Sequence, residues 1–143
     1  MARQTPSPSA GYSGTPLWKK LGYKPGLAAH LDGAPEGYAD LLALPADVEV
    51  TWLARPPKGV ALVHVFERRA APLERKLKSY RGLLAANGAL WVSWPKKASG
   101  VPTDVTEDTV RALALPLGFV DIKVCAVDAT WSGLKLVVRR ELR

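Results

Sequence analysis

The stretch GVALVHVFERRAAPLERKLKSYRGLLAANGALWVSW, residues 59–94, decides the fold of this chain. Residues 59–67 are almost continuously apolar, which is typical of a strand buried on both faces. Apolar side chains then recur on one helical stripe, at Leu73, Leu77, Tyr80 and Leu84. Asn87-Gly88 is expected to end this helix in a left-handed conformation, and residues 89–94 are a second apolar strand. A strand, a helix and a strand in this order predict a right-handed crossover between parallel strands.

The segments on either side continue the alternation of strands and helices. The elements expected before residue 59 are a helix capped by Thr15 and ended by Gly22, a strand at 27–31, a helix within 32–44 and a strand at 48–53. Those expected after residue 94 are a helix at 104–115 with an Asp104–Glu107 capping box, and two strands within 119–140 that turn at Thr130–Gly133. We therefore predict an α/β fold with a small, doubly wound, mostly parallel, Rossmann-like sheet and a C-terminal antiparallel hairpin.

The composition fits a single globular domain. Of the 143 residues, 48% are hydrophobic and 23% are charged, a balance that excludes a largely disordered protein. We expect residues 12–143 to form one Rossmann-like α/β domain, and residues 1–11, rich in Ser, Pro and Thr, to form a disordered tail. The net charge of +7 favours contact with phosphate groups or acidic surfaces.

Metal, disulfide and membrane roles find no support in the sequence. Cys125 is the single cysteine, so an internal disulfide is excluded, and with only His30 and His64 beside it we expect no metal site. No apolar run approaches the ~18 residues of a membrane span, and the first residues lack the hydrophobic core of a signal sequence. We therefore expect a cytoplasmic protein that does not act at a membrane.

Two segments resemble class I S-adenosylmethionine-dependent methyltransferases. The first is LGYKPGLAAHLDGAPEG, residues 21–37, which is similar to the family's entry into its first strand and the acidic, glycine-rich turn after it. The second is LLAANGALWVSWP, residues 83–95, which is similar to a late helix, turn and strand of that family. The likeness extends loosely over residues 16–140. It implies a methyltransferase-like fold with an antiparallel last strand.

The same comparison reveals departures at the cofactor position. The family's first turn needs successive glycines for a close approach of the backbone to the cofactor, whereas here Pro35 removes an N–H and restricts the turn after Gly33. The family places a carboxylate after the second strand to hold the ribose, and this chain has Arg55 there and no acid. One strand of the family also lacks a counterpart. We therefore expect no cofactor, with S-adenosylmethionine as the alternative.

Three further segments resemble a bacterial family known as domain of unknown function 3052. They are GYSGTPLWKKLG (residues 11–22), WVSWPKKASG (residues 91–100) and VCAVDATWSGLKLVVRR (residues 124–140). This resemblance implies no particular activity.

Any ligand site is expected at the carboxyl edge of the sheet, where strand order reverses. The turn after the first strand and the loop after residues 89–94 both border this edge. Lys96, Lys97 and the Ser99-Gly100 turn are suited to hold an anion by charge and backbone N–H groups, although a solvated loop is the alternative. The ligand-binding residues that we predict here are Asp32, Gly33, Pro35, Trp94, Lys96, Lys97, Ser99 and Gly100.

The expected hairpin tip is a second candidate for ligand binding. Asp128, Trp131 and Ser132 would lie there, and an exposed Trp131 could stack on a base or sugar ring. The alternative is that Trp131 folds back over the end of the sheet.

A run of basic residues lies around the start of the central helix, at Arg68, Arg69, Arg75, Lys76, Lys78 and Arg81. Such a run is either a solvated helix face or a surface that follows a nucleic-acid backbone. No nucleic-acid-binding motif accompanies it.

No catalytic constellation is recognisable. His30 and His64 lie within apolar strands and are expected to be satisfied core histidines, and neither has a nucleophile and an acid at a known spacing, so catalytic residues remain unassigned. The first functional hypothesis is a small Rossmann-like protein that binds an anionic small ligand or a protein partner at the carboxyl edge without catalysis. The alternatives are a divergent S-adenosylmethionine-dependent methyltransferase and a sequence-independent nucleic-acid binder.

Overall fold

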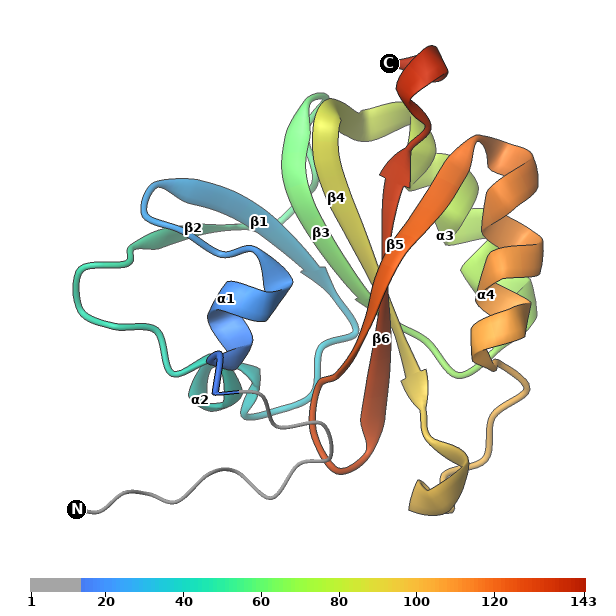
Figure 1. Cartoon of the computed structure of the whole chain (residues 1–143), viewed down its shortest axis with the longest axis horizontal. Coiled ribbons are helices and arrows are strands. Elements are labelled where there is room, and N and C mark those ends of the chain that lie inside the picture. The colour runs from blue at the N-terminus through green and yellow to red at the C-terminus, as the bar shows by residue number, and fades with distance from the viewer. Residues whose placement is uncertain (1–13) are drawn as a thin grey trace.

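The computed structural model of the chain describes residues 14–143. The tail predicted at residues 1–11 lies outside the described residues. Six strands form one sheet in the order β2-β1-β3-β4-β6-β5 (Figure 1). The strands are β1 (Leu27–Asp32), β2 (Val50–Leu53), β3 (Val60–Phe66), β4 (Leu84–Pro95), β5 (Phe119–Ala126) and β6 (Trp131–Val138).

The strand directions confirm the predicted architecture. β2, β1, β3 and β4 run parallel to one another, whereas β6 is antiparallel to both β4 and β5. The sheet is therefore doubly wound and mostly parallel, and its C-terminal hairpin contributes the antiparallel strand.

Helices cover both faces of this sheet (Figure 1). The short helices α1 (Leu17–Leu21) and α2 (Tyr38–Leu42) pack on one face, and α3 (Ala70–Leu83) and α4 (Glu107–Ala114) pack on the other. Short 3-10 turns are η1 (Lys97–Ser99), η2 (Leu115–Leu117) and η3 (Arg140–Leu142). None of the helices in residues 14–143 is long and apolar enough to cross a membrane.

The alternation of side chains along β3 explains its continuous apolar sequence. Val63 and Val65 pack under α3 and α4, while Leu62 and Phe66 pack under α1 and α2. All four are nearly inaccessible to solvent because each face of the strand is covered. The prediction that this strand is buried on both faces is confirmed.

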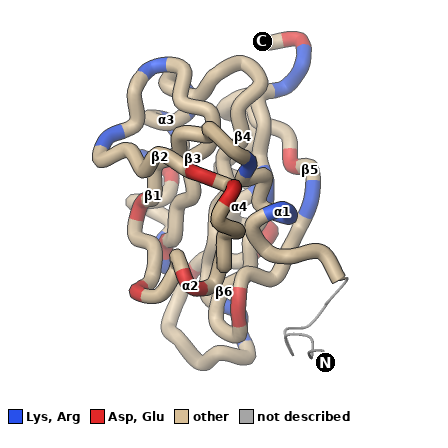
Figure 2. The backbone as a smooth tube through the Cα atoms, turned by 90° about the vertical axis from the view of Figure 1, so that its left-hand side faces the viewer, with Lys and Arg blue, Asp and Glu red and all other residues tan. Residues whose placement is uncertain are grey.

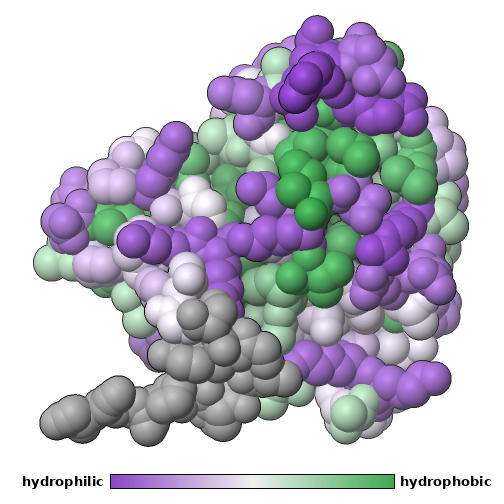
Figure 3. Space-filling view, viewed as in Figure 1, coloured by the Kyte–Doolittle hydropathy of each residue, from purple (hydrophilic) through white to green (hydrophobic). Residues whose placement is uncertain are grey.

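The two faces are covered unequally at the β5–β6 end. The helices α1 and α2 lie over β1 and β3, and no described helix lies in front of the β5–β6 hairpin (Figure 1). Edge strand β5 exposes Val120 (37%), which is opposite Val137 on the face of α1 and α2, and Ile122 (54%). Val124 (49%) is opposite Leu134 and lies on the face of α3 and α4. Hydrophobic areas are correspondingly visible on the α1 and α2 side of the molecule (Figure 3).

Charges are distributed unevenly along the sheet. Basic residues are prominent at the end of the molecule that carries the C-terminus, and acidic residues lie near α2 at the opposite end (Figure 2). The carboxyl ends of β1 and β3 point toward this second end.

Two predicted helix caps are wrong. Thr15 does not cap α1, which begins at Leu17 after Pro16 without a side-chain cap. Helix α4 is capped by Thr106, whose Oγ1 accepts a hydrogen bond from the N–H of Thr109. Asp104 instead accepts a 2.7 Å hydrogen bond from the N–H of Ala70, the first residue of α3. The capping group therefore acts on a helix that is distant in the sequence.

The predicted stop of α3 is also wrong. The helix ends at Leu83, and Leu84 already has an extended conformation because it pairs with Val60 at the start of β4. Asn87 and Gly88 lie inside this strand. A Cβ at Gly88 would lie 3.0 Å from the carbonyl oxygen of Ala61, so glycine allows the close strand approach at the irregularity of the β3–β4 ladder.

The turn of the C-terminal hairpin lies earlier than predicted. Strand β6 begins at Trp131, and Asp128 shapes the turn because its Oδ1 accepts hydrogen bonds from the N–H groups of Thr130 and Trp131, at 2.8 and 2.7 Å. Gly133 lies inside β6, where a Cβ would lie 3.2 Å from the Ser93 Oγ. Gly133 is therefore a packing residue.

Candidate functional site

The candidate site begins where β1 and β3 end. Strand order reverses between the neighbouring strands β1 and β3. The chain goes from β1 to β2 on one side of β1 and then returns to β3 on its other side, and we call this place the switch point. Gly33 follows β1 with φ 75°, and a Cβ there would lie 2.7 Å from the carbonyl oxygen of Phe66. Only glycine therefore allows this turn to lie against the end of β3.

A cluster of charged side chains occupies this point. Lys76 of α3 extends its Nζ to Asp32 Oδ1 at 2.9 Å and to Glu67 Oε1 at 3.0 Å. The hydroxyl of Tyr80, one helical turn further on, donates a 2.5 Å hydrogen bond to Asp32 Oδ2. The N–H groups of Arg68 and Arg69 donate to Glu67 Oε2. We call Asp32, Glu67, Lys76 and Tyr80 the ion cluster.

The ion cluster perturbs the protonation of its members. Burial alone would raise the pKa of Glu67, but hydrogen bonds from Lys76 and from the backbone outweigh burial and lower that pKa. Burial likewise opposes the charge of Lys76, yet its two carboxylate partners raise its pKa. The pKa of Tyr80 is raised by burial and by the adjacent Asp32. The ammonium group of Lys76 lies between the carboxylates of Asp32 and Glu67 and forms an ion pair with each of them.

A second polar network is buried on the opposite face of the sheet. The hydroxyl groups of Tyr23 and Tyr38 lie 2.8 Å apart, and Tyr38 Oη is 2.8 Å from His64 Nδ1. The other ring nitrogen, His64 Nε2, lies 2.8 Å from Ser93 Oγ. Burial lowers the pKa of His64 to about 3, so the ring is neutral and one nitrogen donates while the other accepts. The prediction that His64 is a satisfied core histidine is confirmed.

The structure brings the two predicted lysine and hairpin segments together. Pro95 pairs with Trp131 in the β4–β6 ladder, and the N–H of Lys96 donates to the carbonyl oxygen of Thr130 at 2.7 Å. Lys96 Nζ also donates a 2.8 Å hydrogen bond to the carbonyl oxygen of Asp128. Lys96 therefore joins the end of β4 to the hairpin turn.

The Ser99-Gly100 turn uses its polar groups internally. Ser99 Oγ donates to the carbonyl oxygen of Lys96 and accepts from the N–H of Val101, while the N–H of Gly100 donates to Lys97. The N–H of Ser99 also donates to Lys96. These backbone groups are therefore occupied, and the Ser99-Gly100 turn itself has no free N–H group for an anion.

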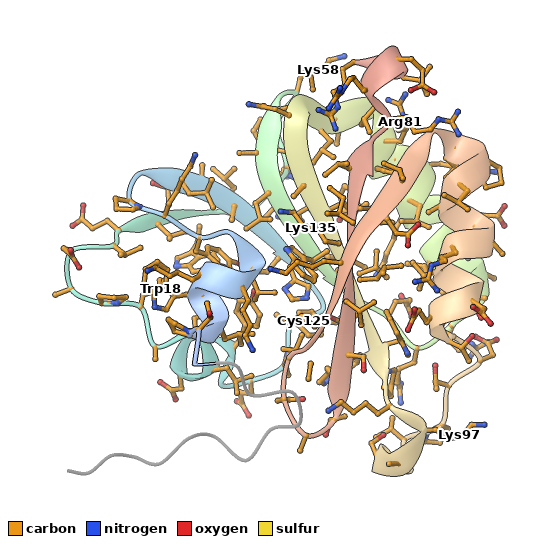
Figure 4. All side chains as sticks on the ribbon, viewed as in Figure 1. Trp18, Lys58, Arg81, Lys97, Cys125 and Lys135 are labelled. Carbon is orange, nitrogen blue, oxygen red and sulfur yellow. The ribbon has the colours of Figure 1, made fainter. Side chains whose placement is uncertain are left out.

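Lys97 and the two tryptophans of this edge lie in different surroundings. Lys97 is exposed at the start of η1, at the far tip of its loop (Figure 4). Trp94 is only 6% exposed and packs in the core under α3 and α4, so its ring does not line the loop surface. Trp131 is half-buried, with its ring 5.1 Å from that of Phe66 at the end of β3.

The remaining predicted residues have local structural contacts. The carbonyl oxygen of Pro35 accepts a hydrogen bond from the N–H of Tyr38, the first residue of α2. Ser132 lies within β6 opposite Trp94, beyond the hairpin turn itself. The tyrosines of the buried network and the roles of Lys76 and Tyr80 are not apparent from the sequence pattern. The one available signal was that a core histidine needs partners for both ring nitrogens.

Part of the basic run is engaged within the protein. Lys76 belongs to the ion cluster, and Arg81 Nε donates a 3.0 Å hydrogen bond to the carbonyl oxygen of Leu117. Lys78 lies 3.9 Å from Glu74 on the helix surface. The run is therefore not a continuous free basic surface. Within residues 14–143, no group of His, Cys, Asp and Glu side chains is arranged to hold a metal ion.

The solved structures similar to this chain include several methyltransferases. A SAM-dependent methyltransferase from Aquifex aeolicus is 14% identical, with a TM-score of 0.58 over 85% of this chain and 88% of that chain. The PH0226 protein from Pyrococcus horikoshii OT3 is 14% identical, with a TM-score of 0.56 over 87% of each chain. NcsB1, an O-methyltransferase from neocarzinostatin biosynthesis solved with S-adenosylmethionine, is 11% identical, with a TM-score of 0.62 over 85% of this chain and 50% of that chain.

No protein-family model matches this sequence, and no curated protein does. The resemblance to domain of unknown function 3052 therefore gains no support from these comparisons. At such low sequence identity, the similar structures establish the fold alone. The chain has the Rossmann-like fold of class I S-adenosylmethionine-dependent methyltransferases.

The polar side chains at the switch point contact one another. The Asp32 carboxylate accepts hydrogen bonds from Lys76 and Tyr80, so both of its oxygens are engaged at the end of β1. At the end of β2, the carbonyl oxygen of Leu53 lies 2.9 Å from His30 Nδ1, and no acid follows it before Arg55. Lys76 and Tyr80 thus contact the carboxylate at the end of β1, at the edge of the sheet where this fold binds ligands.

Proposed function

We propose that this protein is a ligand-binding or partner-binding domain that retains the methyltransferase fold without its cofactor chemistry. Its ligand is an anionic small molecule or an acidic segment of a protein partner, held at the carboxyl edge of the sheet. The observation that carries the proposal is the arrangement of Lys96 between the end of β4 and the hairpin turn.

Lys96 is held in place and still has donors available. Its ammonium group has three N–H donors, of which the Asp128 carbonyl oxygen uses one. No carboxylate of the described residues lies within ion-pair distance of Lys96 or Lys97. An oriented and unneutralised ammonium group beside a half-buried Trp131 favours a ligand with an anionic group and an apolar or ring portion.

The ion cluster supports a role without S-adenosylmethionine. Two carboxylates and one ammonium group satisfy each other at the switch point, so these side chains already have partners within the protein. The buried network of His64 is equally self-contained, since both ring nitrogens have partners. These arrangements favour binding over catalysis.

The test is thermal unfolding of the protein with nucleotides, phosphate-bearing metabolites and S-adenosylhomocysteine. A ligand at 100 times its dissociation constant adds roughly 2.7 kcal/mol to the free energy of unfolding, which raises the midpoint by several degrees. We expect an anionic ligand to stabilise the protein, and Lys96→Ala/Lys97→Ala to abolish that shift. Lys58→Ala/Lys78→Ala is the matched control, because it removes the same charge elsewhere. Unchanged binding in the Lys96→Ala/Lys97→Ala variant would refute the proposal.

The second candidate is a divergent methyltransferase, which the similar structures favour. It predicts a saturable midpoint shift with S-adenosylhomocysteine that Lys96→Ala/Lys97→Ala leaves intact. In that case Asp32→Asn should weaken the shift, because this carboxylate lies at the end of β1.

A further inference from the structure

A pair of lysines lies directly across two strands on the sheet face that α1 and α2 leave uncovered. Lys123 of β5 is opposite Lys135 of β6 in the antiparallel ladder, and Lys135 is opposite Trp91 of β4. Trp91 packs in the core under α1, so both lysines belong to that face. Like charges directly opposite each other on adjacent strands destabilise a sheet.

A third lysine approaches the same place from α1. Lys20 precedes Leu21 in α1, and the carbonyl oxygen of Leu21 accepts a 2.8 Å hydrogen bond from Nε1 of Trp91, the residue opposite Lys135 in the β4–β6 ladder. Burial raises the pKa of Cys125, and the charges of Lys20, Lys123 and Lys96 act on this thiol in the opposite direction. Burial lowers the pKa of Lys135, and the charge of Lys123 adds to the effect. Lys135 and Cys125 lie on the front of the β5–β6 hairpin, beside α1 (Figure 4). We call Lys20, Lys123 and Lys135 the lysine face.

The lysine face has no counterion in the described part of the chain. The ion pairs between residues 14 and 143 involve only Lys76, Lys78, Arg111 and Arg139 as cations. Asp121, on the same strand as Lys123, binds Arg111 of α4 across the other face of the sheet. Three lysines from separate elements thus lie in one region of the fold, and no described carboxylate lies within 4.0 Å of their ammonium groups.

The surroundings of the lysine face favour a small ligand. Val120 and Ile122 of β5 expose apolar side chains next to it. Hydrophilic side chains cross this region between two hydrophobic areas (Figure 3). An extended nucleic-acid surface would be wider and would include arginine, whereas the cations here are lysines only. A compact, multiply charged anion offsets the mutual repulsion of the lysines most effectively.

We propose that Lys20, Lys123 and Lys135 form a binding site for the phosphate group of a small phosphorylated molecule, a phosphate monoester or a diphosphate. Each ammonium group donates to a phosphate oxygen, and the partial burial of Lys135 strengthens its interaction with the bound charge. The apolar portion of the ligand packs on Val120 and Ile122. The site lies on the face of the sheet and is independent of the proposed function at the carboxyl edge.

The test is an NMR titration of the full chain with pyrophosphate, which follows the side-chain signals of the lysines. We expect saturable shifts of Lys20, Lys123 and Lys135, and a dissociation constant at least tenfold weaker in Lys123→Ala/Lys135→Ala. Lys58→Ala/Lys78→Ala removes the same charge elsewhere and should change the dissociation constant less than twofold. An equal loss in both variants, or no saturable shift, would overturn the proposal.

Two further measurements keep the outcome decisive. The Lys123→Ala/Lys135→Ala variant should unfold at the same temperature as the wild type or higher, since it relieves a like-charge pair. A lower midpoint would show that the lysines are structural and would contradict the argument. A single-stranded RNA oligonucleotide forms the last arm. If it binds the lysine face more tightly than pyrophosphate, with a steep salt dependence, the site belongs to a nucleic acid and the small-ligand assignment is wrong.

Discussion

Acidification should destabilise this protein through one buried side chain, His64. The ring is fully buried and hydrogen-bonded to Tyr38 and Ser93, and burial lowers its pKa from 6.5 to about 3. His64 therefore takes up a proton near pH 6.5 in the unfolded chain, whereas its ring stays neutral in the folded protein until the pH approaches 3. Folding stability from this group is complete above pH 6.5 and is lost as the pH falls below it.

The size of the loss follows from the two pKa values. Each pH unit between them costs about 1.4 kcal/mol, so at pH 5 the protein should be roughly 2 kcal/mol less stable than at pH 8. Glu67 affects stability only at lower pH, because its pKa in the folded protein lies below its usual 4.5. Its contribution to the free energy of unfolding is lost as the pH falls below 4.5 and through this lowered pKa. Measurements between pH 8 and pH 5 therefore isolate the histidine.

The assay is urea unfolding followed by tryptophan fluorescence at several pH values. The variant His64→Asn should be less stable at pH 8, because two buried hydroxyl groups lose their partner, but its stability should vary little down to pH 5. The matched control is His30→Asn, which removes the other of the two histidines and should keep the pH dependence of the wild type.

The reasoning is refuted by either of two results. One is a wild-type stability that is flat between pH 8 and pH 5. The other is an NMR titration in which the ring protons of His64 change with a midpoint near 6.5, since that would require a charged ring inside the folded core. The NMR measurement needs no variant, so it remains decisive if His64→Asn fails to fold.

Three further changes test the local geometry. Gly33→Ala should cost on the order of 2–4 kcal/mol, because φ is 75° and the new Cβ would lie 2.7 Å from the carbonyl oxygen of Phe66; a loss below 1 kcal/mol in urea unfolding would contradict the turn geometry. Lys76→Met should cost about 1–2 kcal/mol at pH 7 and less once the pH falls through the lowered pKa of Glu67, because that carboxylate then takes up a proton; a loss that does not depend on pH would exclude the ion cluster as the cause. Thr106→Ala should lower stability by about 1 kcal/mol through the lost helix cap, whereas Thr106→Ser should retain the cap and most of the stability.

Tertiary contacts overrode several local signals that the sequence carries. Asp104 has the residue type and the spacing from Glu107 that predict a cap for α4. It caps α3 instead, because the loop after β4 returns to the start of that helix. Asn87 and Gly88 are residue types that commonly end a helix. Here the helix ends before them, because pairing with β3 already begins at Leu84. In both cases a partner that is distant in the sequence outweighed a local preference of about 1 kcal/mol.

The candidate site could be predicted only in part from the sequence, because its contacts also join residues that are distant in the chain. Lys96 and the hairpin were identified from residue types, but their contact depends on the β4–β6 pairing, which joins residues far apart in the chain. Trp94 resembles its neighbours in the loop, and only the alternation of β4 places its ring in the core. The ion cluster joins the end of β1, the end of β3 and the middle of α3.

The sequence by itself determined the fold class, because apolar periodicity and the strand–helix–strand order depend on neighbouring residues and leave few topologies open. It also determined that His64 belongs to the core, since it lies within an uninterrupted apolar strand. Only the tertiary structure decided that Lys76 occupies the switch point and that Lys123 lies opposite Lys135. Such contacts arise from strand order and register, which are set by the packing of the whole sheet rather than by any single segment.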